Sequence, residues 1–127
     1  MAEDTHTTVQ QLRDWVAQFV EERDWRQFHS PKNLSMALAI EAAELMEHFQ
    51  WIDQEESRQI AAQPDRLTPV AEELADVVCY ALALTNVLGI DLARSVREKL
   101  QKNAQKYPVH EYRGRYGPED PHAPTPA

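Results

Sequence analysis

The chain has 127 residues, with 21 acidic and 13 basic side chains and a formal net charge of −8. This length is enough for one domain with a modest core. The acidic balance argues against a nucleic-acid polymer or an anionic membrane as partner and suits a protein that binds cations. The N-terminus is polar, and the longest apolar run, residues 77–84, is too short to cross a bilayer. We therefore expect a cytoplasmic protein without a membrane partner.

The apolar periodicity of the chain is helical from its first segment onward. Thr8 and Gln11 have the spacing of a capping box, and apolar residues then recur at helical intervals as far as Val20. Ser30 followed by Pro31 predicts the start of a second helix, which runs to about Gln50. A short helix over residues 55–63 is expected to follow it.

Two further helices complete the prediction. Thr68 and Pro69 repeat the cap-plus-proline pattern and predict a third helix that ends at Gly89. Asp91 is the expected cap of a fourth helix, which stops before Pro108. Four main helices with short links predict an all-α fold, a four-helix bundle.

The domain is expected to cover residues 1–110, and residues 111–127 are expected to form a flexible tail. Five of the eight prolines and two of the three glycines lie between Pro108 and the end of the chain. The single cysteine, Cys79, lies in an apolar run and is expected to fill the core rather than act as a nucleophile.

The third helix predicts an assembly of several chains. Its apolar residues lie on two nearly opposite sides: Leu74, Val78 and Leu82 on one, Val77, Leu84 and Val87 on the other. A helix that is apolar around most of its circumference must be buried on most of it. Four helices of this size cannot easily surround one of their own number. We therefore expect a homo-oligomer with this helix near the interface.

Four carboxylates interrupt the apolar stripes of the second and third helices. They form two pairs, Glu41 with Glu44 and Glu73 with Asp76, each spaced i, i+3 so that its members share a face. Burying four carboxylates together is very unfavourable unless cations compensate them. No basic residue lies nearby on the same face of either helix. Mg²⁺ prefers oxygen ligands and binds substrate phosphates as well, so the pattern favours a magnesium site that accepts a phosphate-bearing ligand.

Two other interpretations of these acids remain open. They could line a solvated groove at the edge of each stripe. They could also belong to a di-iron or di-manganese bundle, but such sites use Glu-x-x-His, and neither pair has histidine at its last position.

The acidic pattern, with 28 residues between its two pairs, resembles the signature of the MazG-like all-α NTP pyrophosphohydrolases, and most closely their dCTP pyrophosphatase branch. The similarity extends from about Val9 to His110. The matching segments are Arg23–His29, Asn33–Leu34, Glu41–Leu45, Phe49–Trp51 and Glu72–Val77, with Lys99, Asn103, Lys106, Tyr107 and Pro108 near the end. Most of the loop over 53–67 and the chain beyond His110 have no clear counterpart.

The resemblance implies hydrolysis of a nucleoside triphosphate between its α and β phosphates, giving a monophosphate and pyrophosphate. It implies that Glu41, Glu44, Glu73 and Asp76 bind Mg²⁺. It also favours Glu44 as the residue that accepts the proton of the attacking water, with Glu41 as its catalytic partner. Substrates would be dCTP or modified dCTP, a task of nucleotide-pool housecleaning. The family suggests a homodimer or homotetramer.

The resemblance also implies a set of substrate-binding residues. Trp25, His29 and Trp51 resemble the base pocket of the family, in which aromatic faces stack on a planar base. Tyr80, one turn after Asp76, resembles a residue that contacts the nucleotide near its sugar. On one face of the fourth helix lie the residues expected to hold phosphate or sugar oxygens, Lys99, Asn103 and Lys106.

Two alternative functions stay open at this point. A phosphoribosyl-ATP pyrophosphohydrolase would share the acidic pattern and the fold. A non-catalytic helical module that binds a divalent ion for stability is the second alternative.

Overall fold

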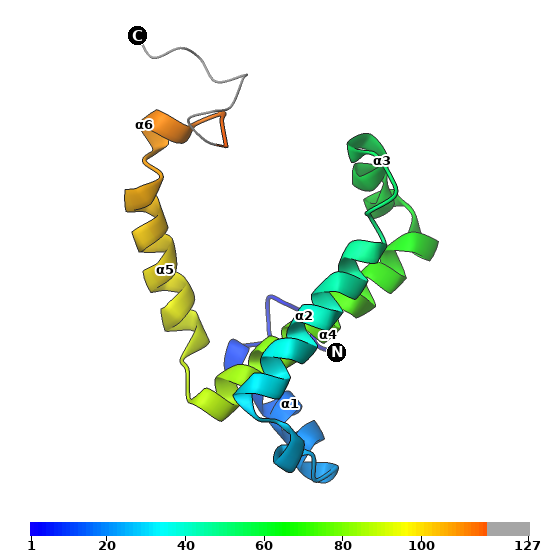
Figure 1. Ribbon diagram of the computed structural model, residues 1–127, viewed down its shortest axis with the longest axis vertical. Coiled ribbons are helices and arrows are strands. Elements are labelled where there is room, and N and C mark those ends of the chain that lie inside the picture. Colours follow the sequence, from blue (N-terminus) through cyan, green and yellow to red (C-terminus); the bar gives the residue numbers. More distant parts are fainter. Residues whose placement is uncertain (117–127) are drawn as a thin grey trace. The chain divides into compact units, whose positions relative to one another are not determined.

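The computed structural model describes residues 1–116, and no strand occurs among them. The prediction of an all-α fold is confirmed. The helices run in the order shown in Figure 1: α1 (Val9–Glu22), the 3-10 turn η1 (Arg26–Phe28), α2 (Pro31–Glu47), α3 (Gln54–Gln59), the 3-10 turn η2 (Ile60–Ala62), α4 (Pro64–Leu88), α5 (Leu92–Lys106) and α6 (Val109–Tyr112). The chain divides into two compact units, one over Met1–Ile90 and one that begins at Asp91.

The predicted helix starts at Thr8, Ser30 and Asp91 are confirmed. The Thr8 hydroxyl accepts a hydrogen bond from the Gln11 backbone N–H at 3.1 Å, and the Gln11 side chain accepts one from the Thr8 N–H at 2.7 Å. Ser30 and Asp91 likewise accept bonds from the N–H groups three residues on. These caps are predictable because every partner lies within one helical turn.

Two helix boundaries differ from the sequence prediction. Helix α4 begins at Pro64, so Pro69, expected to open the helix, lies inside its second turn. Either proline could occupy the first turn of a helix. The helix begins at the earlier one, and its first backbone bond runs from Leu67 N–H to the Gln63 carbonyl at 2.8 Å. Helix α2 ends at Glu47 rather than near Gln50, since residues 48–51 form a turn.

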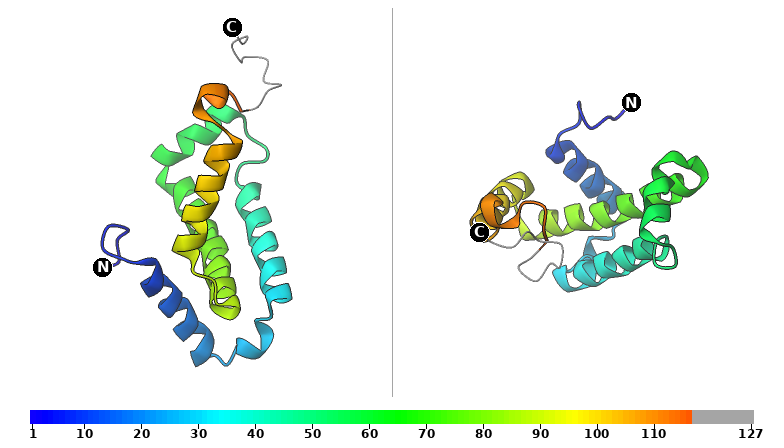
Figure 2. Two further views of the ribbon diagram at one scale, coloured as in Figure 1. Left: turned by 90° about the vertical axis from the view of Figure 1, so that its left-hand side faces the viewer. Right: turned by 90° about the horizontal axis from the view of Figure 1, so that it is seen from above.

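Helices α2 and α4 lie side by side and run antiparallel, and α1 packs on α4 (Figure 2). The buried apolar side chains of the described residues are Leu34, Ile60, Leu82 and Ala83. Thr85 is buried among them, and its hydroxyl donates to the Leu82 carbonyl at 2.7 Å. The core of this unit is therefore a thin seam centred on the contact between α2 and α4.

Cys79 is exposed on α4, so the expectation that it fills the core is wrong for the single chain. It lines a cavity between α1 and α4 instead of packing in the seam between α2 and α4. The pKa of the Cys79 thiol is raised, first by desolvation and then by the negative charge of Asp76. A raised pKa disfavours the thiolate, as expected for a cysteine that is not a nucleophile.

The second unit contains α5 and α6. The Tyr107 and Tyr112 rings meet edge to face with centroids 5.1 Å apart, which links the end of α5 to α6. Helix α6 spans the boundary expected at residue 110, and the tail beyond Tyr116 lies outside the described residues. No single described helix is long and apolar enough to span a membrane.

Candidate functional site

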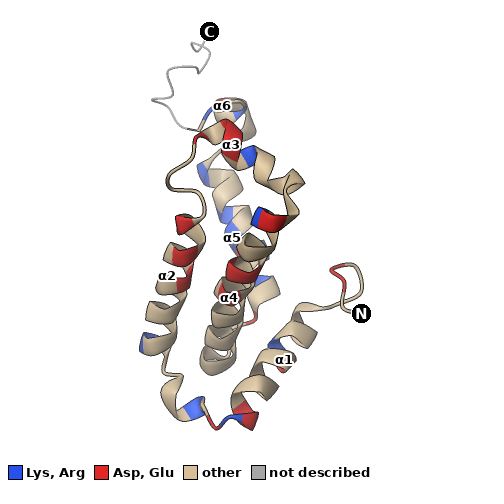
Figure 3. Ribbon diagram, turned by 90° about the vertical axis from the view of Figure 1, so that its right-hand side faces the viewer, with Lys and Arg blue, Asp and Glu red and all other residues tan. Residues whose placement is uncertain are grey.

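The two acidic pairs come together across the seam between α2 and α4. One carboxylate oxygen from each of Glu41, Glu73 and Asp76 lies within 4.8 Å of the others. Glu44, one turn after Glu41, is close enough for its carboxyl to interact with that of Glu41. Figure 3 shows the acidic positions at similar levels on the two helices. The structure thus brings together all four acids that the sequence singled out.

These acids lack cationic partners. No lysine or arginine in residues 1–116 forms an ion pair with any of the four. Glu41 Oε2 and Glu73 Oε2 are buried and have no hydrogen-bond partner. A buried carboxylate oxygen without a donor is costly, and such an orphan atom in a folded protein calls for an explanation.

The crowding of negative charge shows in the acid–base properties of Glu41. Its pKa rises from 4.5 to about 7, first because the carboxyl is desolvated, then because Glu44 and Glu73 can share its proton, and finally because Glu44 and Asp76 repel its charge. A divalent cation would relieve all three effects. The four oxygen donors and the two orphan atoms therefore fit Mg²⁺, which binds a few carboxylates and leaves other positions to water or phosphate.

An apolar cavity of about 730 Å³ extends from α1 to α4 and reaches Asp76 of the acidic cluster. We call it the aromatic cavity. Its walls include Trp25 and His29, which the sequence predicted as base-binding residues, and Tyr80 on α4. A cavity of this volume is large enough for a nucleotide-sized ligand. The structure therefore places three of the predicted binding residues in a cavity that Asp76 also lines.

The turn after α1 sets the position of Trp25. Asp24 adopts a left-handed conformation with φ of 51°, and the Trp25 N–H then donates to the Val20 carbonyl at 3.1 Å. This closes the end of α1 in the way that glycine usually does. The Trp25 ring meets Phe19 edge to face, with centroids 5.8 Å apart. Trp25 is still 43% exposed, so its ring has a face free for a ligand.

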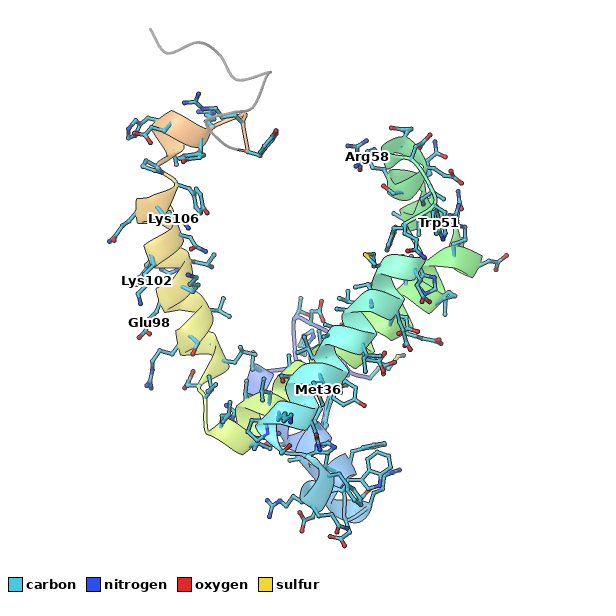
Figure 4. The ribbon with its side chains drawn as sticks, in the orientation of Figure 1. Met36, Trp51, Arg58, Glu98, Lys102 and Lys106 are labelled. Atoms are coloured by element: carbon cyan, nitrogen blue, oxygen red, sulfur yellow. The ribbon has the colours of Figure 1, made fainter. Side chains whose placement is uncertain are left out.

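Trp51 does not lie in this cavity. It follows the C-terminal end of α2, whereas Trp25 and His29 precede its N-terminal end, and the 17 residues of that helix separate them by about 25 Å. Figure 4 shows Trp51 beside α3, far along α2 from Met36. The side chain is 87% exposed. Within one chain the predicted trio of Trp25, His29 and Trp51 is therefore split.

Lys99, Asn103 and Lys106 lie on α5, in the second unit. Lys99 and Lys106 are exposed, and the Asn103 carbonyl accepts the N–H of Tyr107 at 2.8 Å. Lys106 also lies over the Tyr107 ring, at 5.3 Å from its centroid. Their role in binding phosphate stays a prediction.

Sequence reasoning missed three residues of α1, two that line the aromatic cavity and one that ties α1 to α4. Trp15 and Phe19 on α1 line the aromatic cavity, and both are about half exposed. A surface tryptophan on an amphipathic helix was the available signal, because large aromatic rings seldom stay exposed without a partner. Arg13 is the third. It donates a hydrogen bond to Asn86, which is 73 residues away, and no local sequence pattern predicts such a contact.

Comparisons with a family model, with curated proteins and with solved structures agree. The model of the MazG-like family matches residues 36–116. The rat protein dCTP pyrophosphatase 1 is 45% identical over 84% of this chain and 63% of its own length, and the human protein of that name is 40% identical over 81% and 61%. The chain thus spans less than two thirds of these curated relatives. The crystal structure of a pyrophosphatase from Archaeoglobus fulgidus superimposes with a TM-score of 0.74 at 36% identity, covering 85% of this chain and 99% of that one.

Proposed function

Because the chain belongs to the MazG-like family, we propose that it hydrolyses nucleoside triphosphates to the monophosphate and pyrophosphate, with dCTP or a modified dCTP as substrate. The observation that carries the proposal is the cluster of four unpaired carboxylates beside a cavity lined with aromatic side chains. Cytosine as the base is proposed from the similarity to the mammalian dCTP pyrophosphatases, and hydrolysis is proposed from the acidic cluster.

The acids divide the work of binding and proton transfer. Glu41, Glu73 and Asp76 have the closest oxygens and would hold Mg²⁺, with Glu44 completing the set. When bound, the ion would neutralise triphosphate oxygens and lower the pKa of a water molecule. Glu44 lies outside the tightest trio, so its carboxylate is the one best placed to accept the proton of the attacking water.

Recognition of the base falls to the aromatic cavity. The flat faces of Trp25 and its neighbours offer stacking, and His29 and Tyr80 offer hydrogen bonds to the base or sugar. Because the cavity reaches Asp76, a nucleotide whose base lies between α1 and α4 can extend its phosphates toward the acids. Lys99, Asn103 and Lys106 are proposed to bind phosphate or sugar oxygens.

We further propose that the working form is a homodimer or homotetramer. The single chain leaves many large apolar side chains exposed, among them Leu74, Val78 and Val87 on α4. Exposed apolar surface of this extent marks an interaction surface. Trp51 lies about one helix length from Trp25, so it can join the same base pocket only if a second copy supplies it.

The decisive experiment is pyrophosphate release from a panel of canonical and 5-modified dNTPs, with Mg²⁺ or with EDTA. We expect metal-dependent release that is strongest for cytosine nucleotides. Glu41→Ala should lower kcat by at least about a hundredfold, since even the partners of metal ligands are worth ten- to a hundredfold. Glu72→Gln, which removes an exposed acid beside Glu73, is the matched control and should retain activity.

Two outcomes would redirect the proposal. Even activity on all bases would keep the reaction and discard the cytosine preference. Absence of turnover on every dNTP would favour phosphoribosyl-ATP as substrate or a metal-binding module without catalysis. The module predicts that Glu41→Ala lowers stability in Mg²⁺ because the ligand set is lost, with no activity to lose.

A further inference from the structure

Arg13 and Asn86 form a reciprocal contact between α1 and α4. Arg13 Nε donates to Asn86 Oδ1 at 3.0 Å, and Asn86 Nδ2 donates back to the Arg13 carbonyl at 3.1 Å. The guanidinium also donates to the Ile90 carbonyl at 2.9 Å and to the Thr85 carbonyl at 3.4 Å. We call these four bonds the Arg13–Asn86 clamp. A cation on the last carbonyls of a helix also complements its dipole.

The clamp is the polar attachment of α1. Among the described residues, no other hydrogen bond or ion pair joins α1 to α4. Helix α1 contains no fully buried side chain. Its packing on α4 is therefore weak for a helix of 14 residues. The bonds of the Arg13 guanidinium then supply a large part of the free energy that holds α1 on α4.

The position of α1 decides the width of the aromatic cavity. Trp15, Val16 and Phe19 on α1 face Leu74, Val78 and other side chains of α4 across it. A smaller adjoining cavity of about 350 Å³ is lined by Asn86 together with Val16 and His29. The clamp thus lies next to the binding walls, whereas the acidic cluster lies on α2 and α4 and does not depend on α1.

We propose that the Arg13–Asn86 clamp is a positioning device for base recognition: it fixes the α1 wall of the aromatic cavity and leaves the hydrolytic site untouched. This inference rests on the proposed function of the same cavity. It assigns to Arg13 a part in specificity although its side chain lines neither cavity.

The test compares Arg13→Met with wild type. Charge-assisted bonds that hold a wall in place are worth about tenfold or more in an equilibrium, so KM for dCTP should rise about tenfold while kcat changes less than about twofold. Inhibition by pyrophosphate, which has no base, should be unchanged. Hydrogen exchange of the α1 amides should accelerate about tenfold, with no change in α2.

Two further variants separate this role from general destabilisation. Asn86→Asp keeps the acceptor for Arg13 Nε but loses the donor to the Arg13 carbonyl, so it should give an intermediate KM. Arg66→Met is the matched control, because Arg66 joins the start of α4 to Gln63 at 3.2 Å and to Glu56 at 3.6 Å, away from both cavities. It should leave KM and α1 exchange as in wild type.

The possible failures can be told apart. Unchanged KM and unchanged α1 exchange in an active Arg13→Met enzyme would overturn the clamp. If Arg13→Met weakens the binding of dCTP and of pyrophosphate equally, the claim that the clamp acts on base recognition alone is wrong. If the wild-type protein itself releases no pyrophosphate, the proposed function is wrong and the claim about KM falls with it, whereas the exchange data still decide whether the clamp holds α1.

Discussion

At the scale of single residues, some side chains lower the stability of the folded protein. Glu41 is the clearest example: its carboxyl is desolvated and surrounded by other acids, and its Oε2 has no donor. A neutral side chain of the same shape would avoid most of that cost. Under the proposed function, the position lowers the stability of the metal-free protein and in exchange supplies a ligand for a cation.

This trade predicts a pH dependence in EDTA. The pKa of Glu41 is about 7 in the folded protein against 4.5 for the ordinary group, so between these values the folded state holds a proton that the unfolded state has released. The free energy of unfolding should therefore fall as pH rises from about 4.5 to 7. Glu41→Gln should flatten this slope and be the more stable protein at pH 8. Urea denaturation at several pH values measures both, and parallel curves for the two proteins would contradict the assignment.

Asp24 also lowers the stability of the fold, because its backbone is left-handed, with φ of 51°. Asp24→Gly should leave stability unchanged or raise it, whereas Asp24→Val should lower the free energy of unfolding by about 1–2 kcal/mol, because a branched side chain fits this conformation poorly. Thermal or chemical denaturation measures the difference. Asp24→Asn, which tolerates the left-handed region, is the control. Equal stability of the valine and asparagine variants would show that the turn is not strained.

At the scale of elements, the helix ends explain which parts of the fold were predictable. The caps at Thr8, Ser30 and Asp91 were readable because each uses side-chain and backbone groups three residues apart. The start of α4 was not, since Pro64 and Pro69 both satisfy the local rule and only the preceding chain chooses between them.

The same reasoning applies to the site. Four carboxylates on apolar stripes were visible in the sequence, and the structure brings them together. The Arg13–Asn86 clamp and the split between Trp25 and Trp51 were not visible, because both depend on how helices far apart in the chain are placed.

The end of α4 offers a prediction at this scale. Gly89 has φ of 65° and closes the helix by donating its N–H to the Thr85 carbonyl. A Cβ there would meet nothing within 4 Å, so only the backbone conformation opposes it. Gly89→Ala should lower the free energy of unfolding by about 1 kcal/mol and Gly89→Asn by less. Chemical denaturation checks this order, and an alanine variant as stable as wild type would contradict it.

At the scale of the whole molecule, Trp25 and Trp51 lie at opposite ends of α2, although the resemblance predicts that they share one base pocket. The length of α2 forbids it within a chain, and the exposed apolar side chains of α4 supply a surface for a second copy. In a symmetric dimer each of two pockets would then take Trp25 from one subunit and Trp51 from its partner.

A mixing experiment tests this arrangement. Trp25→Ala and Trp51→Ala proteins should each bind dCTP poorly, by about tenfold or more for a lost stacking partner. Subunit exchange between the two should restore about a quarter of wild-type activity at low substrate, because half of random dimers are mixed and each holds one intact pocket. Activity no higher than that of the separate variants would show that each chain builds its pocket alone.

Trp15 and Phe19 of the aromatic cavity lie on α1, whereas the four acids lie on α2 and α4. This separation has an evolutionary consequence. Under the proposed function, substitutions on α1 would reshape the space offered to a base while the carboxylates on α2 and α4 stay as they are. Descendants of such a chain would then change their preferred nucleobase in small steps while they keep the proposed cleavage of a triphosphate. Such a lineage would widen its range of substrates without changing the residues proposed to carry out hydrolysis.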